Sequence, residues 1–273
     1  MEKIFIPINP KNIGQTEISR FLQNIEKEIA SNLFTQNEIS LFEQQLYGKY
    51  LNKKTQLFFL YHFIPLWKKT IKTIFTNKIH PKIIELGCGS GTLCILLSLL
   101  GAETTGIDLN PASIVTCKKR KNFYKNYTNQ FQVNFYTKNV LDFPFQDYDP
   151  VDIFFSFFSF NLMKPYDTLL DHLIPSLKQG GRIIIIDGNT KSIYNHVVPS
   201  RRRKNLPSAE IIQKKLKTLN CKIISIDTYC AIPSFVFRFP ILRQFALKFE
   251  NIIKKIGIHK FFGISYMIVA EKI

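Results

Sequence analysis

The stretch "IIELGCGSGT" at residues 83–92 places three glycines within five positions, directly after a short apolar run that ends in an acid. A glycine-rich turn between a strand and a helix lets the backbone approach a ligand where any Cβ would collide, and it presents the helix N-terminus to that ligand. Gly87, Gly89 and Gly91 are spaced as GxGxG, and Thr92 stands where the dinucleotide fingerprint GxGxxG has its third glycine. The stretch therefore predicts a nucleotide-like ligand other than a dinucleotide.

Two acids lie at the ends of the first two predicted strands. Glu85 is placed where a carboxylate would repel a pyrophosphate but attract a cationic amino group. Asp108, in "GIDLNP", ends the second strand, where a carboxylate can accept hydrogen bonds from both hydroxyls of a ribose. Together with the glycine turn, these acids indicate an adenosine ligand that carries an ammonium group.

From residue 82 onward, apolar strands alternate with helical stretches. The strands are continuous β-branched and aromatic runs rather than alternating ones, which is typical of a parallel sheet covered on both faces. We expect strands at 82–86, 104–108, 132–138, 151–159 and 182–187, and helices at 92–100, after Pro111 and at 166–177. The pattern predicts an α/β fold of the doubly wound type.

Over roughly residues 80–190 the sequence resembles the class I S-adenosylmethionine-dependent methyltransferases. "IIELGCGSGT" and "TTGIDLNP" look like their first two motifs, and "KNVLDFPF" at 138–145 is similar to the third, with Asn139 where the family usually has Asp. "LKQGGRIIIID" is similar to the family's turn into the fifth strand. The resemblance implies a Rossmann-like, seven-stranded sheet that is mostly parallel with an antiparallel last strand, supplied with strands at 222–229 and 263–272.

The same resemblance implies a domain arrangement. Residues 1–80, which begin with helical patterns and a capping box at "TQNE" (35–38), would form an N-terminal helical cap. Residues 81–273 would form the methyltransferase domain, in which a helical insertion at 231–260 precedes the last strand and contributes to the substrate site.

The resemblance also implies a set of cofactor-binding residues for S-adenosylmethionine. Glu85 and the backbone of 87–91 would lie near the methionine part, and Asp108 would bind the ribose. Leu109, Asn139 and the Val140 amide would contact the adenine, and the backbone of 156–157 would lie beside the sulfonium. The full set is Glu85, Gly87, Cys88, Gly89, Gly91, Asp108, Leu109, Asn139, Val140, Ser156 and Phe157, with Cys88 as a small filler.

The catalytic residue is not identified by the sequence. His196, in the segment after the fifth strand, is the best-placed candidate base, although a solvated loop histidine has the higher prior. His62 and Tyr61 lie in an aromatic helical stretch, which favours core or lid packing over catalysis. The sequence "SFFSFN" at 156–161 lacks the Asn/Asp-Pro-Pro-aromatic motif of family members that methylate adenine or amide nitrogen.

The net charge of +17 is unevenly distributed. Residues 1–80 carry +5, residues 81–200 carry +1 and residues 201–273 carry +11. We give equal weight to two interpretations of this excess: a general lysine bias in the sequence, and binding to an acidic partner. In the last third, an apolar stripe at helical spacing runs through 242–256 among basic residues, and we expect it to close the core. In one alternative, this helix and the basic run at 201–204 contact an anionic membrane or a phosphorylated lipid. In the other, the two segments bind RNA.

Composition also limits the kinds of metal site, cellular location and membrane segment that can be expected. Five cysteines without CxxC or Cys/His spacing predict a reducing, cytoplasmic setting and no metal site, and no signal peptide or membrane-spanning run is expected. We predict a methyltransferase that uses S-adenosylmethionine and acts on O, N or C of an apolar small molecule or lipid-like intermediate, in the cytoplasm or at the membrane surface. The alternatives are a tRNA or rRNA methyltransferase, a disfavoured NAD-binding oxidoreductase, and a non-catalytic relative.

Overall fold

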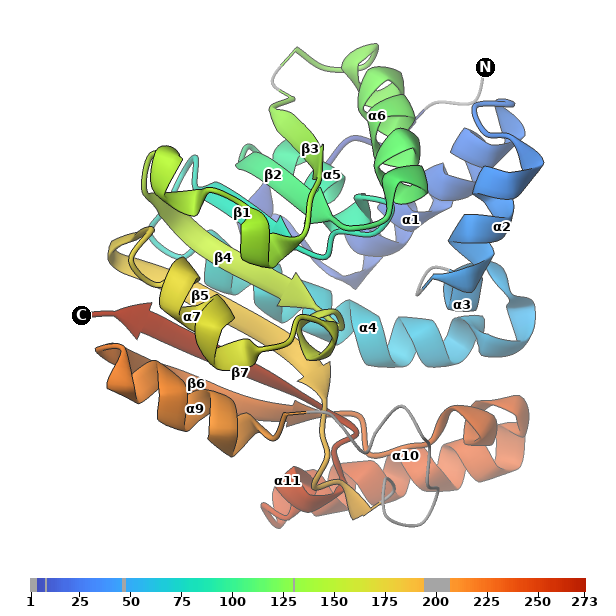
Figure 1. The fold of residues 1–273 in the computed structure, drawn as a ribbon. Helices are drawn as coiled ribbons and strands as arrows, with labels where there is room; N and C mark the ends of the chain where they lie inside the picture. The colour runs from blue at the N-terminus through green and yellow to red at the C-terminus, as the bar shows by residue number, and fades with distance from the viewer. Residues whose placement is uncertain (1–3, 8, 46–47, 130, 194–206) are drawn as a thin grey trace. The chain divides into compact units, whose positions relative to one another are not determined.

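The computed structural model describes residues 4–7, 9–45, 48–129, 131–193 and 207–273 (Figure 1). The chain forms two compact units: residues 1–144 together with 151–155, and residues 145–150 together with 156–273. The helical N-terminal segment thus belongs to the same compact unit as the first strands. The expected domain boundary at residue 80 stays a prediction.

The strands form one seven-stranded sheet in the order β3-β2-β1-β4-β5-β7-β6 (Figure 1). β1 pairs with β2 and β2 with β3 in parallel, whereas β7 is antiparallel to both β5 and β6. The predicted Rossmann-like sheet with an antiparallel last strand is therefore confirmed. The strands are β1 (Lys82–Leu86), β2 (Glu103–Asp108), β3 (Val133–Thr137), β4 (Val151–Phe157), β5 (Leu177–Gly188), β6 (Cys221–Tyr229) and β7 (Ser265–Lys272).

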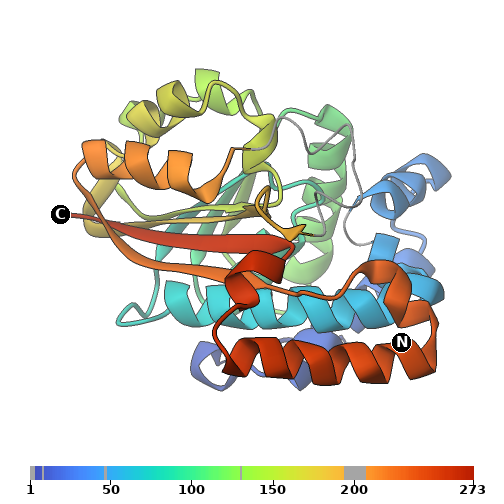
Figure 2. The ribbon, with the colours of Figure 1, turned by 90° about the horizontal axis from the view of Figure 1, so that it is seen from below.

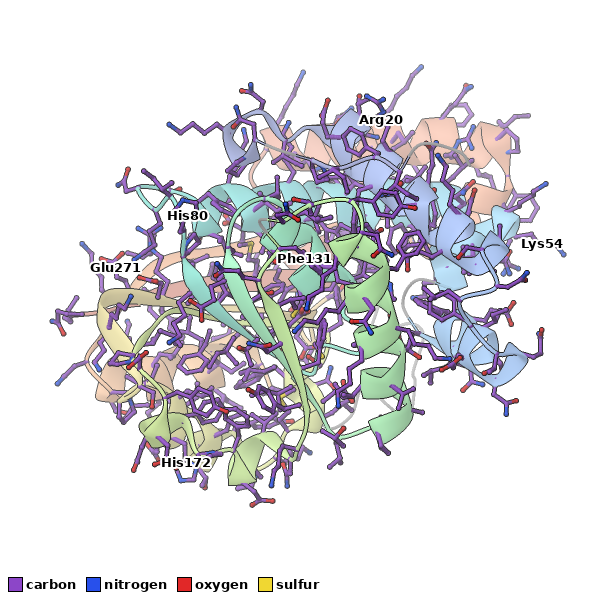
Figure 3. All side chains as sticks on the ribbon, turned by 90° about the horizontal axis from the view of Figure 1, so that it is seen from above. Arg20, Lys54, His80, Phe131, His172 and Glu271 are labelled. Carbon is purple, nitrogen blue, oxygen red and sulfur yellow. The ribbon has the colours of Figure 1, made fainter. Side chains whose placement is uncertain are left out.

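The sequence pattern of the strands accounts for their burial. All seven residues of β4 are buried, as are the last four of β1, which is typical of strands whose two faces are both covered. β7 is buried over its first six residues and ends at the surface. There Arg182 on β5 donates a hydrogen bond of 2.9 Å to Glu271 on β7, which is labelled in Figure 3.

Helices precede and alternate with the strands of the first unit. The predicted capping box is present: the Glu38 carboxylate accepts the Thr35 amide at 2.7 Å, and the Thr35 hydroxyl accepts the Glu38 amide at 3.4 Å. The helices are α1 (Gln15–Ala30), α2 (Gln36–Gln44), α3 (Gly48–Leu51), α4 (Lys53–Ile74), α5 (Thr92–Leu99) and α6 (Pro111–Lys125), with the 3-10 turns η1 (Pro10–Asn12) and η2 (Val140–Asp142).

The second unit contains the insertion that was expected before the last strand. Its long helix, α10, is one continuous element in Figure 2, and the short α11 lies near its C-terminal end. The helices are α7 (Tyr166–Leu173), α9 (Ala209–Thr218), α10 (Pro240–Lys255) and α11 (His259–Phe262), with the 3-10 turns η3 (Phe145–Asp147), η4 (Phe160–Leu162) and η5 (Ser234–Arg238).

The apolar stripe of α10 contradicts one prediction. We expected it to close the core, but among its members only Ile253 is buried, together with the acid Glu250. The other members, Leu242, Phe245, Phe249, Ile252 and Ile256, are each at least half exposed. The inward face of the helix is instead made by the side on which Ala246, Glu250 and Ile253 lie, because these residues are separated by three or four positions.

Within the described residues, no helix combines the length and the apolar character that crossing a bilayer requires.

Candidate functional site

The glycine turn joins β1 to α5 and adopts a backbone that favours glycine. Gly87, Gly89 and Gly91 have φ angles of 69°, 53° and 72°, in the left-handed region that costs other residues energy. At Gly91 the space is also closed, since an added Cβ would lie 2.8 Å from the ring of Phe135 and 2.9 Å from the sulfur of Cys117. The turn is therefore fixed by sterics as well as by dihedral angles.

Glu85 lies beneath this turn and is 3% exposed. Its Oε2 accepts the amide of Cys94 at 3.1 Å and the thiol of Cys94 at 2.9 Å. Because Gly91 at the N-cap of α5 offers no side-chain acceptor, the Glu85 carboxyl caps the first turn of this helix in its place. Burial raises the pKa of Glu85 to about 8, so the carboxyl is mostly protonated at neutral pH, and a cation bound beside it would favour its ionised form.

Asp108, at the end of β2, is tied directly to the turn. Its Oδ2 accepts the amide of Gly89 at 2.8 Å, and its Oδ1 accepts the amide of Asn110 at 2.9 Å. The next side chain, Leu109, is 70% exposed although it is a large apolar residue. The end of β2 thus presents a fixed carboxylate beside an uncovered apolar surface.

The segment that begins at Asn139 lies close to Asp108. β3 pairs with β2 so that Thr137 faces Asp108, and the amide of Lys138 donates to the carbonyl of Asp108 at 3.1 Å. The Asn139 side-chain oxygen accepts the amide of Leu141 at 3.1 Å, and Val140 is buried. Since an amide oxygen has two lone pairs, Asn139 retains the capacity to accept a further hydrogen bond.

Three buried thiols surround the turn. Burial raises the pKa of Cys88 and of Cys94 well above the ordinary value, and the thiol of Cys117 donates to the carbonyl of Gly89 at 3.1 Å. A protonated, buried thiol is a poor nucleophile. This environment agrees with the interpretation of Cys88 as a small filler.

Gln45 was missed by the sequence analysis and lies against the turn. As the C-cap residue of α2, it accepts the amide of Ser90 at 3.1 Å through Oε1 and donates to the hydroxyl of Ser113 at 3.1 Å through Nε2. The N-terminal helices therefore contribute a polar side chain to the candidate site. Nothing in the residue pattern singles out Gln45 from the neighbouring Gln44.

Arg120 was also missed, and it supports the turn from behind. It is fully buried on α6 and donates through Nη1 to the carbonyl of Ser90 and to the hydroxyl of Thr92, both at 2.7 Å. Its remaining donors engage the buried Glu28 on α1, which also accepts the hydroxyl of Tyr124 at 2.7 Å. Burial alone would lower the pKa of Arg120, but the adjoining Glu28 carboxylate raises it. This network links α1, α6 and the glycine turn.

A sequence signal for Arg120 exists. On α6 the buried residues Ile114, Cys117 and Tyr124 lie on one side of the helix. Arg120 lies three residues after Cys117 and four before Tyr124, which places it on the same side. An arginine on the inward stripe of a helix must be paired, which would have suggested a buried acid partner.

The second unit carries the two remaining predicted residues, Ser156 and Phe157, at the end of β4. The Ser156 hydroxyl lies 2.9 Å from that of Ser159, and Phe157 packs edge-on against Phe158 at 5.1 Å between centroids. Phe158 has a φ of 55°, which is unusual for an aromatic residue, and its amide donates to the carbonyl of Ile186 at 2.8 Å.

A buried acid anchors the loop after β4 within the same unit. Asp187 at the end of β5 accepts the amide of Asn161 at 2.8 Å through Oδ2 and the side-chain amide of Asn161 through Oδ1. Burial raises the pKa of Asp187 and also that of Tyr166, whose hydroxyl donates to the carbonyl of Asn161 at 2.9 Å. The loop 158–161 is thus tied through Asn161 to β5 and to Tyr166.

The histidines give no identified base among the described residues. His62 is buried in an aromatic cluster, stacked on Phe63 at 4.5 Å, which agrees with the expected packing role. His80 and His172 are exposed, and both are labelled in Figure 3. His196 lies outside the described residues. In the part of the chain that the structure describes, no three His, Cys, Asp or Glu side chains are grouped to hold a metal ion.

Comparisons with known proteins identify the family. Residues 77–230, more than half of the chain, match the family model described as a methyltransferase domain. The ribosomal RNA small subunit methyltransferase A of Wigglesworthia glossinidia brevipalpis is 31% identical over 143 residues, which are 48% of this chain and 54% of that relative. The chain thus spans about half the length of that relative.

Two solved structures are similar in fold. Magnesium protoporphyrin IX methyltransferase from Synechocystis PCC 6803 with bound SAH has a TM-score of 0.60 at 14% identity, covering 90% of this chain and all of that one (100%). Geranyl diphosphate C-methyltransferase from Streptomyces coelicolor A3(2), in complex with Mg2+, geranyl diphosphate and S-adenosyl-L-homocysteine, has a TM-score of 0.55 at 16% identity, covering 77% and 79%. From the family match and the fold, the chain belongs to the methyltransferase-domain family, within the class I group that depends on S-adenosylmethionine.

Proposed function

We propose that this protein transfers a methyl group from S-adenosylmethionine to O, N or C of an apolar small molecule or lipid-like intermediate. The observation that carries the proposal is the arrangement around the glycine turn, where Asp108 binds the Gly89 amide and Glu85 lies buried beneath. A buried acid and a fixed strand-end carboxylate on either side of one bare turn suit a ligand with an ammonium group and a ribose.

The residues present fit the cofactor. Glu85 would bind its ammonium group together with the turn at 87–91, and Asp108 would accept the ribose hydroxyls. Leu109 offers an exposed apolar surface for the adenine, and Asn139 and the Val140 amide would contact its edge. Within the second unit, the backbone of 156–157 would lie near the sulfonium, and Cys88 would fill the space inside the turn.

The cofactor's sulfonium supplies an electrophilic methyl group, so the protein has chiefly to orient the acceptor and exclude water. Three features of the chain serve that task. Arg120 and Gln45 fix the turn from two sides. Asp187 fixes the loop after β4 through Asn161. A general base is needed only for acceptors of high pKa, and for these His196 stays the proposed candidate.

The acceptor class rests on the apolar character of the chain around the core. Aromatic residues make up 14% of the sequence. Most of those in "LFFLYHF" and "FFSFF" are buried, whereas Phe235 and Phe239 of "SFVFRFP" are 50% and 53% exposed and are available to an apolar acceptor. The structurally similar proteins named for a porphyrin and for geranyl diphosphate act on molecules of this kind, which supports the same class here.

RNA is the second candidate acceptor. The relative named as a ribosomal RNA methyltransferase is 31% identical, and the basic last third of the chain would suit a phosphate backbone. We rank this acceptor lower because the alignment covers 48% of the chain.

A labelling experiment tests the proposal. The purified chain is incubated with S-adenosylmethionine labelled in the methyl group and with three fractions of a cell extract: lipids, small polar molecules and total RNA. We expect the label to enter the lipid or an apolar small-molecule fraction, and the Asp108→Ala variant to lose this transfer. Label in RNA alone would overturn the acceptor class, and no label in any fraction would favour a relative that has lost the reaction.

A further inference from the structure

The exposed apolar face of α10 is a feature that the proposed methyl-transfer site does not use. Leu242, Phe245, Phe249, Ile252 and Ile256 are 51%, 67%, 51%, 55% and 60% exposed. Their spacing alternates between three and four residues, so they form one continuous stripe along the helix. Water is an unfavourable environment for a contiguous stripe of this kind, which marks it as an interaction surface.

The helix is attached to its own unit by the face next to the exposed stripe, about a quarter of a turn around the helix. Glu250 and Ile253 are buried, and the amide of Ile258 donates to the carbonyl of Ile253 at 3.1 Å. Of the exposed stripe, Phe249 also packs edge-on against Phe262 of α11, with 6.1 Å between ring centroids, and the stripe still lies largely at the surface. A partner can cover the stripe without displacing the helix.

The charges on α10 are almost entirely positive. Lys248 and Lys255 are exposed and lie beside the stripe, each three residues after one of its members. The only acid on the helix, Glu250, is buried and paired with Lys254 at 2.9 Å. Arg238, in the turn before the helix, adds another exposed cation. A partner that complements this face must be apolar at its centre and anionic at its rim.

The apolar surface includes Ile241 in the first turn of the helix and Phe235 and Phe239 just before it. Phe235, Phe239 and Ile241 are 50%, 53% and 72% exposed. Aromatic and aliphatic side chains of this size bury effectively at the boundary between headgroups and acyl chains. Ile241 and Phe239 lie within three residues of Leu242 along the chain, and Phe235 lies in the 3-10 turn that leads into the helix.

A second copy of this chain fits the stripe poorly. A 16-residue helix is roughly 24 Å long, and one face about 10 Å wide is far below the roughly 800 Å² per partner that a stable dimer needs. Pairing two such faces would also bring lysines against lysines. RNA would satisfy the charges, and its bases could stack on Phe245 and Phe249, but it would leave the aliphatic Leu242, Ile252 and Ile256 without an apolar partner.

We propose that α10 is an in-plane docking helix for an anionic membrane surface, with its stripe among the acyl chains and Lys248 and Lys255 at the headgroups. The inference builds on the proposed lipid-like acceptor, since an enzyme docked in this way meets an apolar acceptor where that acceptor is dissolved. Binding strength then depends on both buried apolar area and headgroup charge.

Vesicle flotation with the full chain tests the inference. The vesicles contain phosphatidylcholine alone, or phosphatidylcholine with phosphatidylglycerol at about one part in three. We expect binding to the anionic vesicles only, with a decline at high salt. Phe245→Glu/Phe249→Glu should reduce binding to background, and Lys248→Gln/Lys255→Gln should weaken it by roughly 25-fold at low salt, since each lysine near the surface contributes about fivefold.

The control is Lys214→Gln/Lys217→Gln, which removes the same charge from exposed positions on α9. It should bind vesicles like the unmodified chain. Equal binding by the Phe245→Glu/Phe249→Glu variant would overturn the inference. The inference would also be overturned if the unmodified chain formed a dimer that the Phe245→Glu/Phe249→Glu variant does not form. Binding of tRNA that depends on the α10 lysines, without binding to vesicles, would overturn it too. The affinity of the same variants for S-adenosylhomocysteine should stay unchanged. This measurement tests the proposed cofactor site independently of membrane docking.

Discussion

The buried carboxyl of Glu85 should make the stability of the protein fall as the pH rises. Its pKa is about 8 in the folded chain against 4.5 ordinarily, because burial disfavours the ionised form. Between these values the folded chain binds more protons than the unfolded chain, so the free energy of unfolding decreases with pH. From about pH 5 to about pH 8 the decrease from this one group is about 3 kcal/mol, at 1.36 kcal/mol for each pH unit near the middle of the range.

Glu85→Gln removes this titration while it keeps a side chain of similar size. Urea unfolding of both proteins across the pH range should show a curve for the variant that lacks the wild-type decline. Glu103→Gln, at an exposed position at the start of β2, should keep the decline and serves as the control. Saturating S-adenosylhomocysteine should flatten the wild-type curve, since an ammonium group near Glu85 favours the carboxylate. Parallel curves for wild type and Glu85→Gln without ligand would refute the reasoning.

The other predictions concern the turn and its supports. Gly91→Ala should destabilise the chain by about 2–4 kcal/mol in urea unfolding, because the alanine would have an unfavourable positive φ and its Cβ would clash with Phe135. In the Gly91→Ala background, Phe135→Leu should restore part of the loss. Arg120→Met should cost about 3–5 kcal/mol because Glu28 is left buried and unpaired, whereas Glu28→Met/Arg120→Met should cost much less; equal costs would show that the pair is not coupled. Asp108→Ala should weaken binding of S-adenosylhomocysteine by about 1–3 kcal/mol in calorimetry, and an unchanged affinity would mean that the second motif is misassigned.

The fold could be predicted from the sequence because its strongest signals are local. β1 (KIIEL) and β4 (VDIFFSF) are short, mainly apolar runs, and the helix of α10 follows from a simple periodicity. The candidate cofactor site follows from the same kind of signal. Glu85, the glycines and Asp108 all lie at strand ends, which a parallel sheet brings to one edge.

The supports of the site depend on contacts between segments far apart in the chain. α6 carries Lys118, Lys119, Arg120 and Lys121 in succession; the helical period places Arg120 on the inward side, but its pairing with Glu28, 92 residues away, is not encoded locally. Gln45 reaches the turn because α2 ends beside it, which no local pattern encodes. The stripe of α10 was predicted correctly as a helix face but wrongly as a core face, since periodicity shows that a helix has an apolar side and does not show what covers it.

The central claim is that the glycine turn, with Glu85 and Asp108, binds the methionine cofactor rather than a dinucleotide. Isothermal titration calorimetry of the purified chain with S-adenosylhomocysteine and, separately, with NADH tests it most directly. The account predicts one-to-one binding of S-adenosylhomocysteine and no binding of NADH. Binding of NADH without binding of S-adenosylhomocysteine would contradict it.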